Sequence, residues 1–408
     1  MDYVILEAWL EFAVRWVHVI TGIAWIGSSF YFIALDLGLR KSDDLPENVH
    51  GEEWQVHGGG FYHVQKYLVA PDRLPEHLIW FKWESYSTWL SGFAMLILVY
   101  YMGAELYLID PNVLDIPVWQ AILISLGSLA FGWLVYDLIC KSKFGEDSTR
   151  LMVLLYLILV AMAWGYTQVF TGRAALLHLG AFTATIMTAN VFVIIMPNQR
   201  IVVGDLRAGR TPDPKYGKIA KQRSTHNNYL TLPVIFLMLS THYPLAFASQ
   251  YNWLIAALVF LMGVTIRHYF NSSHAGKGQP KWTWAATTAL FFVIIWLSTL
   301  TATVVVDTDE AALAPSVQRF VDADGFEDAY DIVVGNCSMC HSEEPGYDGI
   351  PWAPKGVHLE TEAQVAFAAK RIYLQAGVTH AMPPPSASYL EAEDRAVLVA
   401  WYRAATGG

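Results

Sequence analysis

The stretch Leu151-Met-Val-Leu-Leu-Tyr-Leu-Ile-Leu-Val-Ala-Met-Ala-Trp-Gly-Tyr-Thr-Gln-Val-Phe170 contains no charged side chain. A helix needs about 20 apolar residues to cross the hydrocarbon core of a bilayer, so this stretch predicts a transmembrane helix. The whole chain is 54% hydrophobic and only 15% charged. Eight spans are predicted, at residues 12–38, 84–104, 118–139, 151–170, 174–196, 229–248, 252–269 and 283–306. The sequence therefore predicts an all-α fold in which residues 1–306 form an eight-span transmembrane helical bundle.

The run Cys337-Ser-Met-Cys-His341 follows the last predicted span. Cys-x-x-Cys-His is the attachment pattern of c-type haem, in which both thiols bond to the porphyrin and the histidine ligates the iron. The alternatives are a redox disulfide and half of a zinc site. A zinc site would need a second Cys/His pair at ligand spacing, and none follows. We therefore expect Cys337, Cys340 and His341 to hold a haem c.

A second axial ligand to that haem is expected downstream of the motif. Met382 lies in the segment His380-Ala-Met-Pro-Pro-Pro385, whose prolines stiffen the loop, and methionine is a frequent second ligand in cytochromes c. His380 and His358 are competing candidates. Residues 391–405 are expected to form a closing helix. The sequence thus predicts an acidic linker at residues 307–325 and a small all-α cytochrome c domain at residues 326–408.

The distribution of basic residues orients the predicted bundle. The loops at 40–77, 140–150, 197–228 and 267–282 hold 17 Lys and Arg residues together, whereas the alternate loops and the N-terminal segment hold only Arg173. Basic loops stay in the cytoplasm. This asymmetry predicts a multi-pass protein of a bacterial inner membrane with both termini and the cytochrome c domain on the periplasmic side. The net charge of −10 argues against a nucleic-acid partner.

Ionisable residues inside predicted spans are costly and are therefore functional candidates. Glu11, Arg15 and His18 are spaced to lie on one face of the first helix, and His178 lies in the fifth. Both histidines are expected toward the outer edge of the bundle. They are candidates for binding a haem b between helices. The alternatives are hydrogen bonds to neighbouring helices or the lining of a substrate cavity.

The predicted inner side carries a second group of polar residues. His57-Gly-Gly-Gly-Phe-Tyr-His63 precedes Pro75-Glu-His77 and Lys82-Trp-Glu84. Three consecutive glycines beside aromatic residues are typical of a close backbone approach to a ligand or another segment. A surface loop with packing glycines is the alternative. His77, Lys82 and Glu84 are kept as catalytic candidates.

The chain resembles the bacterial membrane-bound cytochrome c urate oxidases. The resemblance covers nearly the whole sequence, and its specific part is a set of motifs joined to Cys337-x-x-Cys-His341: His57-Gly-Gly-Gly-Phe-Tyr62, Lys66-Tyr-Leu-Val-Ala-Pro71, Pro75-Glu-His-Leu78 and Trp80-Phe-Lys-Trp-Glu84. It implies oxidation of urate to 5-hydroxyisourate with water as the oxygen source and no hydrogen peroxide. It also implies that electrons leave through haem c to the respiratory chain, with a soluble cytochrome c or a terminal oxidase as the acceptor.

Two substrate sites are compatible with this chemistry. Urate is a planar monoanion, so its site needs cationic or amide donors, an aromatic partner and a base. An outer site would use Glu11, Arg15 and His18. An inner site would use Lys66, His77, Lys82 and Glu84 and would need an intermediate electron carrier such as haem b. A quinol or other small-molecule dehydrogenase, and a transporter or anchor with a fused electron-transfer domain, are the alternative functions.

Overall fold

The computed structural model describes residues 3–46, 49–67, 75–300, 313–348, 350, 352–384 and 387–407. The chain forms two compact units. The bundle unit comprises Ala8–Thr241 and Leu245–Thr301, and the C-terminal unit comprises Ala302–Gly408 with the short segments Met1–Glu7 and His242–Pro244.

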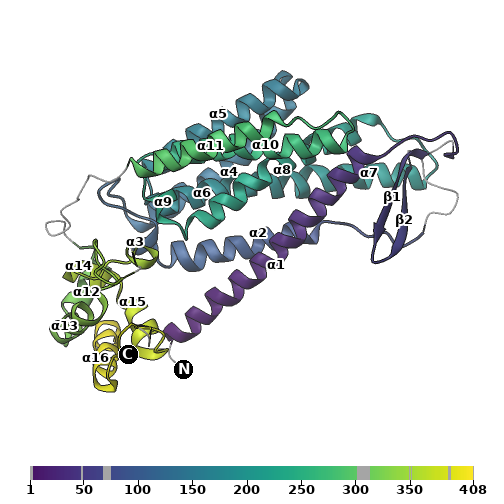
Figure 1. The fold of residues 1–408 in the computed structure, drawn as a ribbon. Coiled ribbons are helices and arrows are strands. Elements are labelled where there is room, and N and C mark those ends of the chain that lie inside the picture. The colour runs from purple at the N-terminus through teal and green to yellow at the C-terminus, as the bar shows by residue number, and fades with distance from the viewer. Residues whose placement is uncertain are drawn as a thin grey trace. The chain divides into compact units, whose positions relative to one another are not determined.

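Long helices make up most of the bundle unit (Figure 1). They are α1 (Tyr3–Gly38), α2 (Trp83–Met95) with the π-helix η1 (Leu96–Tyr101), α4 (Val118–Lys141), α5 (Ser148–Thr167), α6 (Gly172–Ala189) with the π-helix η3 (Asn190–Ile195) and α7 (Met196–Arg207), α8 (Pro214–Ser240), α10 (Asn252–His274) and α11 (Trp282–Thr299). Short helices α3 (Ala104–Tyr107), η2 (Lys143–Glu146) and α9 (Pro244–Phe247) lie in the connections.

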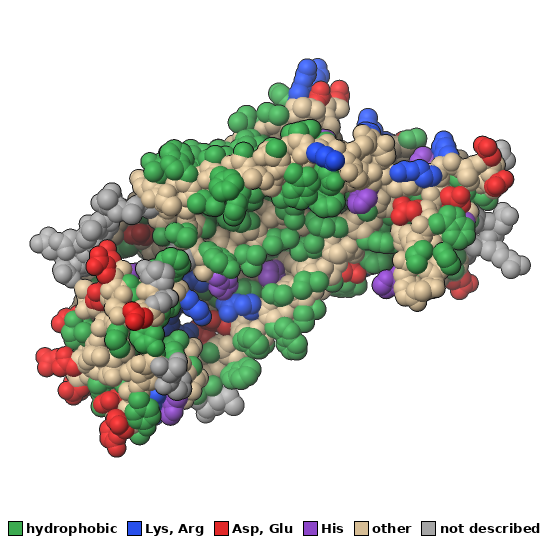
Figure 2. All heavy atoms as spheres, viewed as in Figure 1, with side chains coloured by type: hydrophobic (Ala, Val, Ile, Leu, Met, Phe, Trp, Pro, Cys, Tyr) green, Lys and Arg blue, Asp and Glu red, His purple; other side chains and the backbone are tan. Residues whose placement is uncertain are grey.

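Six of these helices are long and apolar enough to cross a membrane, counted over the described residues: α1, α4, α5, the continuous α6–η3–α7 helix, α10 and α11. Helices also occupy the other two predicted spans, but neither meets the same measure. The helix at 84–104 changes to a π-helix at Leu96, and α8 begins with a polar half and contains Pro233. The eight-span count stays a prediction. Figure 2 shows the mainly hydrophobic flank that the bundle presents.

A β-hairpin interrupts the helical pattern, so the all-α prediction was wrong at this place. Strands β1 (Val49–His57) and β2 (Gly60–Tyr67) pair antiparallel, with Trp54 opposite His63. Gly58 and Gly59 form the turn with φ of 60° and 78°. A two-residue hairpin turn requires such positive φ angles, which explains these two glycines without a bound ligand. We call the end of the bundle that carries this hairpin the hairpin end.

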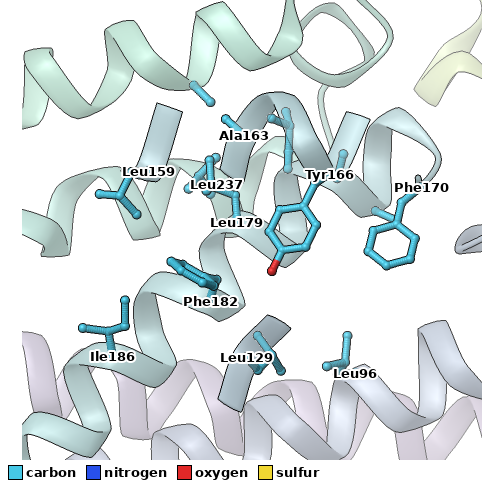
Figure 3. Packing of buried hydrophobic residues seen from close by; sticks show 14 of the residues in the cluster. Leu96, Leu129, Leu159, Ala163, Tyr166, Phe170, Leu179, Phe182, Ile186 and Leu237 are labelled. Carbon is cyan, nitrogen blue, oxygen red and sulfur yellow. The ribbon is translucent and has the colours of Figure 1, made fainter. Parts of the chain in front are cut away.

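The core of the bundle surrounds α6, the most deeply buried of the candidate spans. Tyr166 and Phe182 point into the same packed space as Leu129 and Leu179 (Figure 3). Gly132 allows α4 to pack closely against α6, because a Cβ at this position would overlap the ring of Phe182. Protein interiors are close-packed, so this contact leaves no room for adjustment.

The C-terminal unit contains only short helices in its described part. They are α12 (Pro315–Val321), α13 (Phe326–Cys337), η4 (Pro354–Gly356), α14 (Glu362–Phe367), α15 (Ala369–Ile372), η5 (Tyr373–Val378) and α16 (Ala392–Thr406). The closing helix predicted at 391–405 is present as α16. Its Trp401 is 1% exposed and donates its Nε1–H to the Phe320 carbonyl at 2.8 Å, while Tyr402 stacks on Tyr373. This unit therefore has its own aromatic core.

The glycine contact between α4 and α6 predicts a stability difference between two substitutions in one helix. Gly132→Ala should destabilise the protein by about 1–3 kcal/mol, the usual cost of overpacking, because Phe182 is buried and cannot move away. Gly127→Ala is the matched control, since a Cβ at Gly127 meets no atom within 4 Å. Thermal unfolding in detergent should show a lower midpoint for Gly132→Ala alone. Equal midpoints would contradict the packing described for α4 and α6.

Candidate functional site

The Cys-x-x-Cys-His motif begins at the last residue of α13. The amide groups of Cys340 and His341 donate hydrogen bonds to the Cys337 carbonyl at 3.1 and 2.9 Å, which folds the motif into a tight turn. The Nδ1–H of His341 donates to the Val357 carbonyl at 2.9 Å. This bond fixes the ring and leaves Nε2 as the nitrogen that can ligate a metal, as in other metal-binding histidines.

The two thiols of the motif do not form a disulfide. Burial raises the pKa of the Cys337 thiol to about 11, and the neighbouring Cys340 acts in the same direction. Reactive Cys-x-x-Cys pairs instead have lowered pKa values, so this environment does not favour a redox-active dithiol. Within the described residues, no group of three or more His, Cys, Asp or Glu side chains could hold a metal ion. The zinc alternative therefore lacks its ligands there.

The segment with Met382 is held by its backbone. The Met382 amide donates to the Gln375 carbonyl at 2.9 Å, and its own carbonyl accepts from Nη1 of Arg395 in α16 at 3.0 Å. The Met382 side chain is 38% exposed, and Trp352 and Tyr389 of the same unit are 69% and 72% exposed. Large apolar groups left in water are what a bound porphyrin would cover, so the residues present fit a haem. Axial ligation by Met382, rather than His358 or His380, stays a prediction.

The first helix contacts the second through His18. Its Nδ1–H donates to the Thr88 carbonyl at 2.9 Å, and the Ser91 hydroxyl lies 3.2 Å from the same nitrogen. A Cβ on Gly92 would lie 2.8 Å from Cε1 of His18, so glycine is needed for this close packing. The bond to Thr88 leaves the lone pair of the His18 ring on Nε2.

Two arginines act electrostatically on a buried phenol, in a group that we call the arginine–tyrosine cluster: Arg15 of α1, Tyr100 of η1, Tyr107 of α3 and Arg173 of α6. Tyr100 is 4% exposed, and its hydroxyl and the Nε of Arg173 are buried without a hydrogen bond of normal geometry. Tyr100 interacts electrostatically with Arg173 and Arg15, and the Arg173 guanidinium lies 5.4 Å from the centroid of the Tyr107 ring. Unpaired buried polar atoms are rare in folded proteins, so they indicate a place where another molecule can bind.

Only part of this cluster could be found from the sequence. Arg15 was predicted as a site residue from the polar face that it shares with Glu11 and His18. Arg173 entered the sequence analysis only as the single basic residue of the predicted outer loops, and it was not predicted as a site residue. Tyr100 lies in an apolar run, and no neighbouring residue in the sequence marks it as part of a site. Only tertiary structure brings it near the two arginines.

His178 is fully buried, and both of its ring nitrogens have partners. Its Nδ1–H donates to the Ala174 carbonyl and its Nε2 accepts from the Ser125 hydroxyl, both at 2.8 Å. The rings of Phe170 and Tyr100 pack around it at centroid distances of 4.6 and 5.9 Å. This arrangement corresponds to the hydrogen-bonding alternative for His178. Ligation of a haem b would first have to displace the Ser125 hydroxyl.

The predicted inner candidates are not joined into one site by any hydrogen bond or ion pair between described residues. His77 is exposed, and Lys82 lies over the Trp83 ring at 5.7 Å just before α2 begins. Glu84 has one carboxylate oxygen buried without a partner. Lys66, on β2, pairs with Asp36 of α1 at 2.5 Å. The hairpin is thereby fixed to α1.

A buried polar network links α4, η3 and α8. Arg223, which is 1% exposed, donates to Asp137 at 2.7 Å and to the side-chain oxygen of Asn190 at 3.3 Å. The Tyr136 hydroxyl joins the network through Nδ1 of His226 at 2.7 Å. A run of polar residues at 223–228 inside a helix is the feature of the sequence that indicates such a network. The sequence alone does not indicate that Asp137 of α4 pairs with Arg223.

Comparison with known proteins places most of the chain in a family. A model described as the urate oxidase N-terminal family matches residues 4–298. The chain belongs to this family. The match covers the bundle and ends before the Cys-x-x-Cys-His motif. The family description supports an oxidoreductase that acts on urate. No curated protein and no solved structure matches the chain significantly.

The buried ion pair of the polar network predicts a large stability effect. Asp137→Asn should destabilise the protein by about 3–5 kcal/mol, because it leaves the Arg223 charge buried without its partner. Asp147→Asn is the control, since Asp147 pairs with Arg150 on the surface and exposed pairs contribute about 0–1 kcal/mol. Thermal unfolding in detergent distinguishes the two. A midpoint for Asp137→Asn as high as that of the control would contradict a structural role for the ion pair.

Proposed function

We propose that the chain oxidises urate to 5-hydroxyisourate at the arginine–tyrosine cluster and passes the electrons to a covalently bound haem c in its C-terminal unit. The observation that carries this proposal is the buried Tyr100 hydroxyl on which Arg173 and Arg15 both act electrostatically, in a bundle that belongs to a urate oxidase family. The basic-loop asymmetry predicts that Arg173 and the cytochrome c domain are on the same side of the membrane.

The reaction balances without oxygen as a reactant. The urate monoanion and one water give neutral 5-hydroxyisourate, one proton and two electrons. The hydroxyl oxygen therefore comes from water, and no hydrogen peroxide forms. The site must hold the anion, orient a water molecule against the ring and take up protons as the electrons leave.

The residues of the bundle can supply each of these functions. Arg15 and Arg173 provide charge-assisted donors for the anionic purine edge, and guanidinium groups bind planar anions in a fixed geometry. The buried Tyr100 hydroxyl, which interacts with Arg173, makes no other hydrogen bond of normal geometry and can turn toward the substrate. His18 lies one turn after Arg15 with its lone pair on Nε2, so it is our choice of base, and Glu11 is the second candidate.

The C-terminal unit supplies the binding site for the electron acceptor. A haem c bound there would take up one electron at a time. Cys337 and Cys340 would hold it, the Val357 carbonyl would orient His341, and Met382 would approach from the segment fixed by Arg395. Because urate loses two electrons, the second must wait on the substrate or on another cofactor. If that cofactor is a haem b, the Nε2 of His18 is the nitrogen left for iron, because its Nδ1 bonds to Thr88 whereas both ring nitrogens of His178 are bonded, and Glu11 is then the base.

An anaerobic visible spectrum of the purified oxidised protein tests the proposal. Addition of urate should produce the α band of reduced c-type haem. Arg173→Gln should lower kcat/KM for urate roughly 30- to 100-fold, the effect of losing about 2–3 kcal/mol of charge-assisted hydrogen bonding. Arg150→Gln, an exposed arginine at the start of α5, should behave like the wild type. A protein that dithionite reduces normally but urate does not would overturn the proposal.

The attachment of haem c has a separate test with an internal control. Cys337→Ser and Cys340→Ser should each remove one thioether bond and greatly reduce the haem that stays with the polypeptide on a denaturing gel. Cys140→Ser should not change it, because Cys140 is a free thiol on α4 in the bundle. Peroxidase staining of the gel measures this directly. Undiminished staining in both motif variants would exclude covalent attachment at this site.

A further inference from the structure

A pocket opens at the hairpin end of the bundle between α1, α8 and α10. Its volume is about 220 Å³. It is lined by Ile33, Asp36 and Leu37 from α1, Lys221, Thr225 and Tyr229 from α8, and His268, Asn271, Ser272, Ala275 and Lys277 from α10 and the residues after it. None of these residues belongs to the arginine–tyrosine cluster or to the haem site, so the pocket has no role in the proposed reaction.

The pocket has an excess of positive charge at its rim. Within the described residues, neither Lys221 nor Lys277 forms an ion pair. The one carboxylate of the lining, Asp36, is already paired with Lys66 at 2.5 Å. Two exposed ammonium groups therefore face the same space without a counter-charge. This pattern fits a bound anion.

The polar rim of the pocket adjoins apolar surface. Ile33 and Leu37 form one wall on a helix that is long and apolar enough to cross a membrane. Tyr229 lines the pocket, and Trp282, which is 62% exposed, lies 6.1 Å from the His268 ring. Tyr and Trp side chains gather at the boundary between the hydrocarbon core and the headgroups. The aromatic residues beside the lysines match this boundary, and Ile33 and Leu37 supply the apolar part of the lining.

We propose that this pocket binds the phosphate of an anionic phospholipid, with Lys221 and Lys277 on the headgroup and the first part of an acyl chain along Ile33 and Leu37. Basic pockets between transmembrane helices bind such headgroups. A soluble anion such as inorganic phosphate or urate could use the same lysines, but it would leave the apolar wall unfilled. The membrane phospholipid is therefore the source that the lining favours.

The test uses the full-length protein, delipidated in neutral detergent. Phosphatidylglycerol is added in mixed micelles, with phosphatidylcholine as the uncharged comparison, and bound lipid is counted by native mass spectrometry beside the thermal unfolding midpoint. Lys221→Gln/Lys277→Gln should bind phosphatidylglycerol about 30-fold more weakly, as expected from two lysines at about 1 kcal/mol each. Lys215→Gln/Lys218→Gln removes the same charge from the exposed start of α8 and should bind like the wild type.

Each outcome decides the proposal. Loss of binding in the pocket variant alone supports it. Equal weakening in both double variants would mean nonspecific attraction to a charged micelle, and unchanged binding in the pocket variant would mean that the lysines do not hold the lipid. In a third arm, inorganic phosphate or urate replaces the lipid. A lysine-dependent rise in the unfolding midpoint with a soluble anion, and none with phosphatidylglycerol, would assign the pocket to that anion instead.

Discussion

Inside a bilayer, polar groups must find their partners within the protein, and the helical bundle depends on this constraint. His178 uses both ring nitrogens, and Arg223 and Asp137 neutralise one another between α4 and α8. Against this background the exceptions are informative. The hydroxyl of Tyr100 and the Nε of Arg173 lack hydrogen bonds of normal geometry, and Tyr100 also interacts electrostatically with Arg15. Other buried atoms, among them one oxygen of Glu84 and the Nε of Arg223, break the constraint as well. We assign the substrate to the first place because two arginines act on one buried phenol there.

The proposal assigns urate oxidation to the bundle and electron acceptance to the C-terminal unit because of the groups that each unit can bind. The bundle provides cationic and aromatic side chains but, among its described residues, no set of metal ligands. The C-terminal unit provides two thiols, an oriented histidine and exposed apolar side chains. A planar anion suits the first environment and a porphyrin suits the second. Under this proposal, substrate chemistry and electron acceptance would use different units of one chain.

The helices could be predicted from the sequence because a long apolar run inside a bilayer must satisfy its own backbone hydrogen bonds, and a helix does so. Helices occupy the described part of all eight predicted spans, of which residues 301–306 lie outside the described residues, and six of the described helices reach the length and apolarity needed to cross a membrane. The hairpin at 49–67 was missed because consecutive glycines were interpreted as a ligand contact rather than as a turn. Helical spacing predicted that Glu11, Arg15 and His18 share one face of the first helix, and their role in a site stays a prediction. Tyr100 and Asp137 were not, because their partners lie on helices that only tertiary packing brings near.

The central claim is that urate gives its electrons to the protein's own haem and not to oxygen. The most direct measurement is an anaerobic titration of the oxidised protein with limiting urate, followed by the same reaction in air with an assay for hydrogen peroxide. The account predicts two electrons delivered to the protein's haem pool per urate consumed and no peroxide in air. One peroxide per urate, with the haem remaining oxidised throughout, would contradict it.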